Sequence, residues 1–262
     1  MLITISGKGG VGKTTITAML VDELLRQNYP GRLLVVDADP AQTLHLALGV
    51  AEPGATLAQV RETTSFKAAD IRALPVGLTP TEAVRRKLAN SNVIVSRVLR
   101  DRSFDLMAMG HGEGQGCYCA VNGALSEALA AVMDSYNLII IDNEAGLEHL
   151  SRYRIKQVDL FLVVIRPGRA AVTVGRQIQG LAEQVGMNLS EVGYILNHTS
   201  AVSITPPVEP LLAQVPVSMQ LTRQEMTGEG AVVSLTDDAP ARLSLLAVVE
   251  KIEAASVRHM VP

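Results

Sequence analysis

The residues best suited to carry chemistry stand close to the start of the chain, between Gly7 and Thr14. They read G-K-G-G-V-G-K-T and fit the phosphate-binding pattern G-x-x-x-x-G-K-[ST]. Glycines let successive backbone N–H groups turn toward phosphate oxygens. Lys13 is then expected to reach the β- and γ-phosphates, and the Thr14 hydroxyl to bind Mg²⁺. The run therefore predicts a site for ATP or ADP with Mg²⁺. Its predicted nucleotide contacts are Gly9, Gly10, Val11, Gly12, Lys13, Thr14 and Thr15.

Lys8 is a second lysine in this loop, which the basic pattern does not require. The resulting motif, K-G-G-x-G-K-[ST], resembles that of the deviant Walker A ATPases. This family includes MinD, ParA, the nitrogenase iron protein and the metal-insertion ATPases. The resemblance implies a homodimer in which Lys8 reaches across the interface to the partner's nucleotide. It makes Lys8 a candidate catalytic residue beside Lys13.

Acidic residues end two apolar runs further along the chain. Asp37 and Asp39 follow the run R-L-L-V-V, and Asp142 follows the run L-I-I-I. Ligands of an open α/β sheet bind at the carboxyl ends of its strands, so all three acids are expected near the phosphates and Mg²⁺. Asp37 and Asp39 could instead cap a helix that begins near Ala41.

The resemblance to the deviant Walker A family implies a role for each of these acids. Asp39 corresponds to the acid that orients the attacking water, and Asp37 to a supporting residue on the Mg²⁺ side. Asp142 begins the segment D-N-E-A-G and corresponds to the Walker B acid, which holds Mg²⁺, often through water. Gly146 would then give its N–H to the γ-phosphate. Asn197, which ends the run V-G-Y-I-L-N, matches an asparagine that recognises adenine in relatives.

Cys117 and Cys119 are the two cysteines of the chain and form a C-x-C on a glycine-rich stretch. In an extended segment, residues two apart project to the same side, so two thiolates could bind one soft metal ion. A closed site usually has four ligands, which two copies of the chain around a two-fold axis would supply. Planar coordination by four thiolates suits Ni²⁺, and tetrahedral coordination suits Zn²⁺. Alternatively, the two cysteines are reduced and inert.

The segments around the cysteines and after Asp142 narrow the resemblance. G-Q-G-C-Y-C-A and A-G-L-E-H-L are similar to segments of the CooC-type nickel-insertion ATPases, and the similarity extends over nearly the full length. It implies an ATP-dependent homodimer that binds Ni²⁺ through Cys117 and Cys119. The apo forms of carbon monoxide dehydrogenase or the related acetyl-CoA synthase are the implied clients. Asn143 and Glu144 depart from those relatives, which have a small or apolar residue and glycine before the alanine.

Two other classes of protein share the loop motif. A reductase resembling the nitrogenase iron protein would hold a [4Fe–4S] cluster through cysteines far apart in sequence, which a C-x-C fits poorly. A partitioning or positioning ATPase of the MinD or ParA type would usually have a basic amphipathic C-terminal helix or a basic DNA-binding face. Residues 250–262 contain acids among their basic residues and form no basic stripe. Neither class explains the C-x-C.

The elements that must position these residues alternate between strand and helix signals. Strands are expected at residues 2–5, 32–37, 104–109, 138–142, 158–165, 192–197 and 215–217. Helices are expected at residues 15–27, 41–48, 81–88, 124–133, 170–185 and 240–257. This alternation predicts an α/β fold with a doubly wound, mainly parallel sheet of about seven strands and helices on both faces, as in P-loop NTPases. We expect residues 1–262 to form a single ATPase domain.

Composition agrees with such a fold and limits the partners. The chain is 48% hydrophobic but only 3% aromatic, so its core must consist mainly of aliphatic side chains, which suit a covered parallel sheet. A net charge of −3 gives no support for a nucleic-acid or anionic-membrane partner. No apolar run reaches the length of a membrane span or a signal peptide, and two cysteines make no disulfide framework. We therefore expect a cytoplasmic location.

Overall fold

Apolar runs rich in Val, Ile and Leu form the central sheet of the computed structural model. The structure describes residues 1–63, 79–110, 127–144, 157–200, 208–227, 230, 232, 235–236 and 239–258. Cys117, Cys119 and Gly146 lie outside the described residues. The roles expected for these three residues stay predictions.

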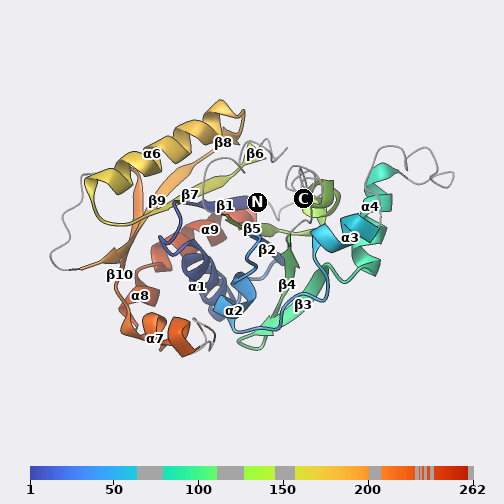
Figure 1. Ribbon diagram of the computed structural model, residues 1–262, viewed down its shortest axis with the longest axis horizontal. Coiled ribbons are helices and arrows are strands. Elements are labelled where there is room, and N and C mark those ends of the chain that lie inside the picture. The colour runs from blue at the N-terminus through green and yellow to red at the C-terminus, as the bar shows by residue number, and fades with distance from the viewer. Residues whose placement is uncertain are drawn as a thin grey trace.

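Within the described residues, eight strands form the main sheet in the order β10-β9-β7-β1-β5-β2-β4-β3 (Figure 1). Their bounds are β1 (Leu2–Ser6), β2 (Leu33–Ala38), β3 (Ile94–Leu99), β4 (Arg102–Ala108), β5 (Leu138–Asn143), β7 (Leu160–Ile165), β9 (Val192–Thr199) and β10 (Leu211–Pro216). The pairs are parallel except for β3 with β4, which is antiparallel. The strands β6 (Gln157–Val158) and β8 (Asn188–Leu189) form a separate parallel pair. The predicted α/β fold with a mainly parallel sheet is confirmed.

The edge strand β3 is the eighth strand, where the sequence predicts about seven. Its side chains alternate between half-buried and exposed along most of its length, so it lacks the continuous apolar run that marks the buried strands. It joins β4 through the two-residue turn Arg100–Asp101, and both residues have positive φ, 54° and 58°. Such turns usually carry Asn-Gly or Asp-Gly. Arg-Asp gives no comparable signal in the sequence.

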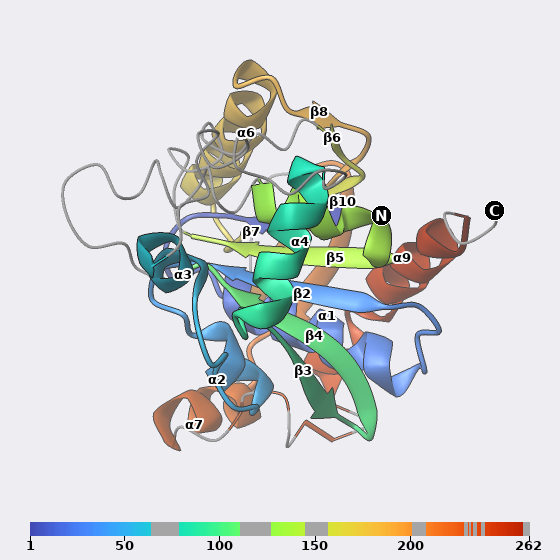
Figure 2. The same cartoon turned by 90° about the vertical axis from the view of Figure 1, so that its right-hand side faces the viewer.

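Helices cover both faces of the sheet (Figures 1 and 2). Their bounds are α1 (Lys13–Arg26), α2 (Leu44–Leu48), α3 (Leu57–Thr63), α4 (Pro80–Asn90), α6 (Arg169–Gln184), α7 (Met219–Thr227), α8 (Pro240–Leu243) and α9 (Leu246–Arg258). Residues 127–132 are also helical and continue into a 3-10 turn, Met133–Ser135. One core cluster packs α1, α2, α8 and α9 against one face, and a second packs α3, α4, residues 128–132 and α6 against the other.

The helix pattern differs from the expectation in four places. The sequence missed α3 and α7, while the predicted C-terminal helix is divided into α8 and α9. The helix expected at 41–48 begins only at Leu44. As expected, the buried core is largely aliphatic, with few aromatic members such as Phe161 and Tyr194.

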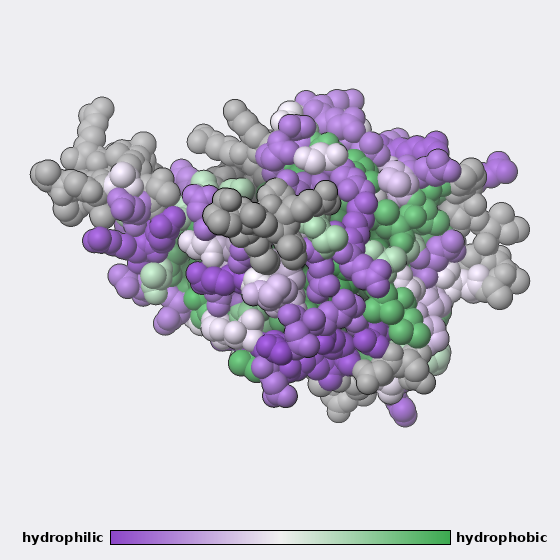
Figure 3. All heavy atoms as spheres, turned by 180° about the vertical axis from the view of Figure 1, so that it is seen from behind, coloured by the Kyte–Doolittle hydropathy of each residue, from purple (hydrophilic) through white to green (hydrophobic). Residues whose placement is uncertain are grey.

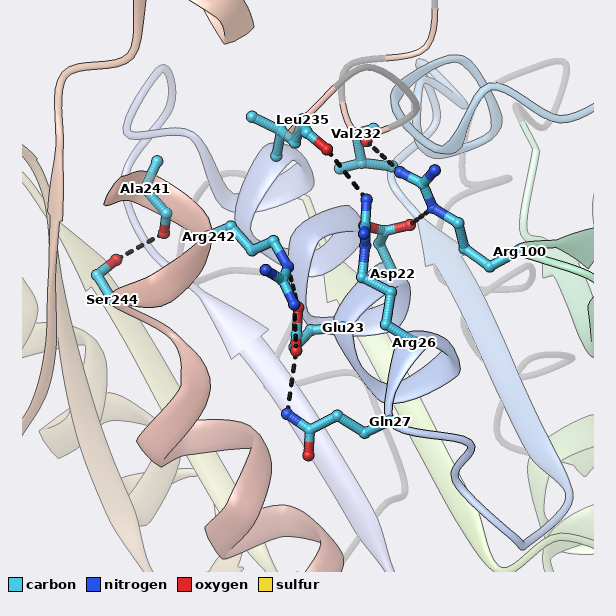
Figure 4. A network of polar contacts seen from close by, with 10 residues as sticks. All are labelled: Asp22, Glu23, Arg26, Gln27, Arg100, Val232, Leu235, Ala241, Arg242 and Ser244. Atoms are coloured by element: carbon cyan, nitrogen blue, oxygen red, sulfur yellow. Dashed lines mark hydrogen bonds and ion pairs between the residues drawn. The ribbon is translucent and has the colours of Figure 1, made fainter. Parts of the chain in front are cut away.

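Two buried acids of α1 tie the helix to distant parts of the chain (Figure 4). Asp22 accepts hydrogen bonds from Arg26 and from Arg100 in the β3–β4 turn, each at 2.8 Å. Glu23 accepts two bonds from Arg242 of α8, at 2.5 and 3.1 Å. Because α1 starts at the end of the glycine-rich loop, these pairs also hold that loop's helix in place.

The face seen from behind in Figure 3 is mostly hydrophilic, with smaller apolar patches between the polar side chains. Among the described helices, none is long and apolar enough to cross a lipid bilayer.

Candidate active site

The loop between β1 and α1 is held close to the neighbouring strand β7. A Cβ on Gly7 would lie 2.5 Å from the carbonyl oxygen of Val164, so only glycine fits there without a shift. Gly12 caps α1 with a left-handed backbone, φ 91°, and its carbonyl accepts the first helical bond, from Ile16 N–H at 2.9 Å. Glycine adopts this conformation at little cost. The loop thus leads directly into the N-terminus of α1, where backbone N–H groups favour an anion.

Asn197 lies under the loop rather than at its rim. Its Nδ2 donates to the Val11 carbonyl at 2.8 Å, and its Oδ1 accepts from the His198 N–H at 2.9 Å. The residue is buried, and a Cβ on Gly12 would collide with its amide. Asn197 therefore supports the shape of the loop, a role that the sequence analysis missed. Its contact with adenine stays a prediction.

Lys13 is buried at the start of α1 among three carboxylates. Only 7% of the residue is exposed, and this burial lowers the pKa of Lys13. The charges of Asp142, Asp39 and Glu144 act in the opposite direction. The carboxylates thus offset part of the effect of burial on the pKa of Lys13.

Asp37 and Asp142 occupy adjacent strands in register, as the strand-end argument predicts. Burial raises the pKa of Asp37 to about 7, and the charge of Asp142 adds to the rise. Burial also raises the pKa of Asp142 to about 6, against hydrogen bonds from Thr14 and Thr17 and the charge of Lys13. Two buried carboxyl groups side by side disfavour ionisation of both, and a cation between them would relieve that cost.

Asp37 and Asp39 also shape the segment after β2. Asp37 accepts hydrogen bonds from the N–H groups of Asp39 at 3.1 Å and Leu44 at 3.0 Å. Asp39 accepts from the Ala41 N–H at 2.9 Å. Neither acid is the N-cap of α2, which is Thr43, but the Asp37 carboxylate accepts from the N–H of its first residue, Leu44. Asp39, half-buried at the loop side, remains available for a further role.

Known proteins that are similar to this chain identify its family. A model of the AAA-domain family matches residues 1–190. An uncharacterized ATP-binding protein of Methanocaldococcus jannaschii is 34% identical, over 75% of this chain and 74% of its own length. The chain therefore belongs to the AAA-domain family. It is a ParA/MinD-like P-loop ATPase.

Two further relatives bear on this ATPase. The carbon monoxide dehydrogenase accessory protein CooC of Rhodospirillum rubrum is 31% identical, over 71% of each chain. The septum site-determining protein MinD of Pyrococcus horikoshii OT3, solved as a complex with Mg-ADP, superposes with a TM-score of 0.71. It is 23% identical and covers 97% of this chain and 96% of its own, so it shows the α/β P-loop fold.

The residues of the ATPase fit a magnesium ion. The Oδ2 of Asp142 is buried and has no hydrogen-bond partner in the described structure. Its Oδ1 accepts from Thr17 at 3.2 Å, and Thr14 also bonds this carboxylate. Mg²⁺ prefers carboxylate, hydroxyl and water oxygens. Thr14 and Asp142 would hold the ion, with Asp37 beside it, and the ion would neutralise charge on the phosphates.

Thr17 and Asn143 are site residues that the sequence analysis did not find. Thr17 stands four residues after Lys13, which places both on one face of α1, so helical spacing could have revealed it. Asn143 donates to the Ile5 carbonyl at 3.0 Å and to the Ser6 hydroxyl at 3.1 Å. It therefore fastens the end of β5 to the start of the loop, a long-range contact that no local pattern indicates.

The metal site expected at the cysteines lies outside the described residues. Elsewhere, in the part of the chain that the structure describes, no group of three or more His, Cys, Asp or Glu residues has the arrangement of a metal site.

Proposed function

We propose that this ATPase is a dimeric nickel metallochaperone. It hydrolyses Mg·ATP and inserts Ni²⁺ into apo carbon monoxide dehydrogenase or the related acetyl-CoA synthase. The observation that carries the proposal is the C-x-C of Cys117 and Cys119 in a chain 31% identical to a carbon monoxide dehydrogenase accessory protein.

The nucleotide part of the proposal assigns each residue a role. Lys13 and Thr14 hold Mg·ATP together with Asp142, and Asp39 orients the attacking water. Lys8 contacts the nucleotide of the partner copy. The burial of Lys13 among carboxylates and the register of Asp37 with Asp142 support these assignments, because they place cation and acids on one sheet edge.

The metal part of the proposal rests on coordination chemistry. Each chain supplies two thiolates, and a closed site needs four ligands. Two copies around a two-fold axis therefore bind one ion, Ni²⁺ as cargo, with Zn²⁺ as a competitor. We further propose that residues 1–262 form one ATPase domain, that the protein acts in the cytoplasm, and that it needs neither nucleic acid nor membrane.

Sedimentation with and without Ni²⁺ and a non-hydrolysable ATP analogue tests this assignment. We expect each ligand to increase the dimer fraction and each to tighten binding of the other by the same factor, roughly 5- to 150-fold. Cys117→Ser with Cys119→Ser should abolish the metal effect and leave ATP binding by the monomer nearly unchanged. Metal bound one per chain to a monomer, without any effect on dimerisation, would overturn the intersubunit site.

A positioning ATPase of the MinD type is the second candidate. The superposition with MinD over 97% of this chain favours it. Elemental analysis separates the two. Nickel or zinc near half an ion per chain supports the metallochaperone, and iron with sulfide would point to a reductase. A metal-free protein that binds anionic vesicles only with ATP would favour the MinD-type role.

A further inference from the structure

A pocket of about 440 Å³ lies on the side of the phosphate-binding loop that faces α6. We call this the outer side of the loop, and the side of Lys13 and its carboxylates the inner side. One wall is the loop itself, residues 8–11, and the other is the first part of α6. Val174 and Ile178 are among the apolar side chains that line it. α6 covers the sheet face opposite α1 (Figure 1). The pocket is therefore distinct from the cluster of Lys13 and its acids.

Three cationic side chains line this pocket: Lys8, Arg166 and Arg169. Arg166 follows β7 directly and Arg169 is the first residue of α6, and all three residues are exposed. No acidic residue is among the lining residues of the pocket. Within the described residues, none of the three cations has an ion pair. No carboxylate of the described residues therefore neutralises these three charges, and all three side chains are exposed to an approaching anion.

The two sides of the loop thus differ in charge. On the inner side, Lys13 has three carboxylates near it. On the outer side, three cations gather without an acid. A nucleotide held by Lys13 of the same chain is expected beside these carboxylates, whereas Arg166 and Arg169 line the pocket on the other side of the loop. The outer cations are available to an anion that a second molecule brings.

We propose that Arg166 and Arg169 join Lys8 in contacting the nucleotide bound by a second copy of this chain. The inference rests on the proposed function, in which Lys8 reaches the partner's nucleotide. A two-fold axis that brings Lys8 to the partner's phosphates carries the other residues of the same pocket with it. Guanidinium groups bind phosphate oxygens in a bidentate manner and keep their charge at any physiological pH.

The first test measures ATP turnover of Arg166→Ala and Arg169→Ala over a range of protein concentrations. Each substitution should lower turnover by about 10- to 100-fold, the range expected for loss of a hydrogen bond to a charged group. ATP affinity of the dilute monomer should stay unchanged, because both arginines line the pocket next to α6 and are not among the charges that act on Lys13. Arg176→Ala is the matched control. It lies on the same helix, is exposed and does not line the pocket, so its turnover should equal that of the wild type.

The second test mixes two inactive proteins, Asp39→Ala and the double variant Arg166→Ala with Arg169→Ala. In a mixed dimer, the double variant has its own Asp39 and receives both arginines from its partner. An equal mixture should recover roughly a quarter of wild-type turnover, because half of the dimers are mixed and each has one complete site. A mixture of Asp39→Ala with Lys8→Ala tests Lys8 in the same way.

The outcomes separate this inference from the proposed function. Recovery with Lys8→Ala but not with the double arginine variant would overturn the role of the arginines and leave the dimeric mechanism intact. Wild-type turnover of the double arginine variant would also overturn the role of the arginines. If neither mixture recovers activity, the action of all three cations on a partner's nucleotide is wrong. Binding of inorganic phosphate or an acidic peptide to the pocket of a monomer, abolished in the double variant without any loss of turnover, would assign the pocket to another ligand.

Discussion

At the scale of single residues, the candidate site contains a lysine buried among acids. Lys13 is 7% exposed and is surrounded by the charges of Asp142, Asp39 and Glu144. Lys13→Ala removes the cation that is expected to hold the β- and γ-phosphates and leaves the acids to repel them. We therefore expect loss of tight ATP binding in calorimetry. The control is a thermal unfolding curve that shows a folded variant; a folded variant with unchanged ATP affinity would refute the site.

Asp37 and Asp142 are expected to make nucleotide binding depend on pH. Their pKa values are raised to about 7 and about 6, mainly by burial. A proton then competes with Mg²⁺ for these carboxylates below neutral pH. We expect the affinity for Mg·ADP to rise between about pH 5 and about pH 8, as measured by calorimetry. Binding of ADP in the presence of EDTA should show a much smaller rise.

The same raised pKa values affect the stability of the ligand-free protein. Each group binds its proton more tightly when folded than when unfolded, so its contribution to the free energy of unfolding is largest below about pH 4 and is lost as pH rises through its folded pKa. Mg·ADP should restore the loss at high pH.

At the scale of elements, ion pairs that anchor α1 differ from those on the surface. Arg242 and Glu23 join α8 to α1 with side chains 15% and 2% exposed, whereas Lys251 and Glu191 are 40% and 43% exposed. Arg242→Ala leaves Glu23 buried and without this cation, so we expect the free energy of unfolding to fall by about 3 kcal/mol. Lys251→Ala, the control, should change it by less than about 1 kcal/mol. Urea unfolding measures both. Equal effects would contradict the role of burial.

Two glycines of α6 provide a matched pair for its packing on the sheet. A Cβ on Gly175 would lie 2.8 Å from Ile165 Cγ2 and 3.1 Å from Tyr194 Cε1, whereas a Cβ on Gly180 would meet nothing within 4 Å. Gly180→Ala should raise the free energy of unfolding by about 0.5–1 kcal/mol, because alanine favours the helix. Gly175→Ala should lower it, since α6 must move away from β7 and β9. Stabilisation by both substitutions would show that α6 tolerates the shift.

At the scale of the whole molecule, hydrolysis is expected to require two copies of the chain. A cation supplied by a partner can raise the rate of phosphoryl transfer by about 10³–10⁵. Turnover per chain should therefore rise with protein concentration, and Lys8→Ala should lose hydrolysis while keeping much of its ATP affinity. Steady-state assays across the dimerisation range measure this. Turnover that stays flat with concentration and survives the loss of Lys8 would exclude a role in trans.

The sequence predicted most of the fold because its signals are local. Buried parallel strands need continuous apolar residues, and β1, β2, β5 and β7 carry such runs and are buried along their whole length. The sequence did not predict the edge strand β3, because one side of it meets solvent and its Arg100–Asp101 turn lacks glycine. No proline or glycine stands at the break between α8 and α9. The sequence therefore predicted a single helix there.

By itself, the sequence determined the phosphate-binding loop and the acids at the strand ends, because their chemistry requires particular residue types at short spacings. Only the tertiary structure placed Asn197 under that loop, 186 positions from its partner Val11. It also brought Arg242 to Glu23 and Arg166 to the pocket beside Lys8. Such contacts join segments far apart in the chain, and they form only when the strands of the sheet have this order. That order arises from the packing of the whole molecule, which no local pattern of residues encodes.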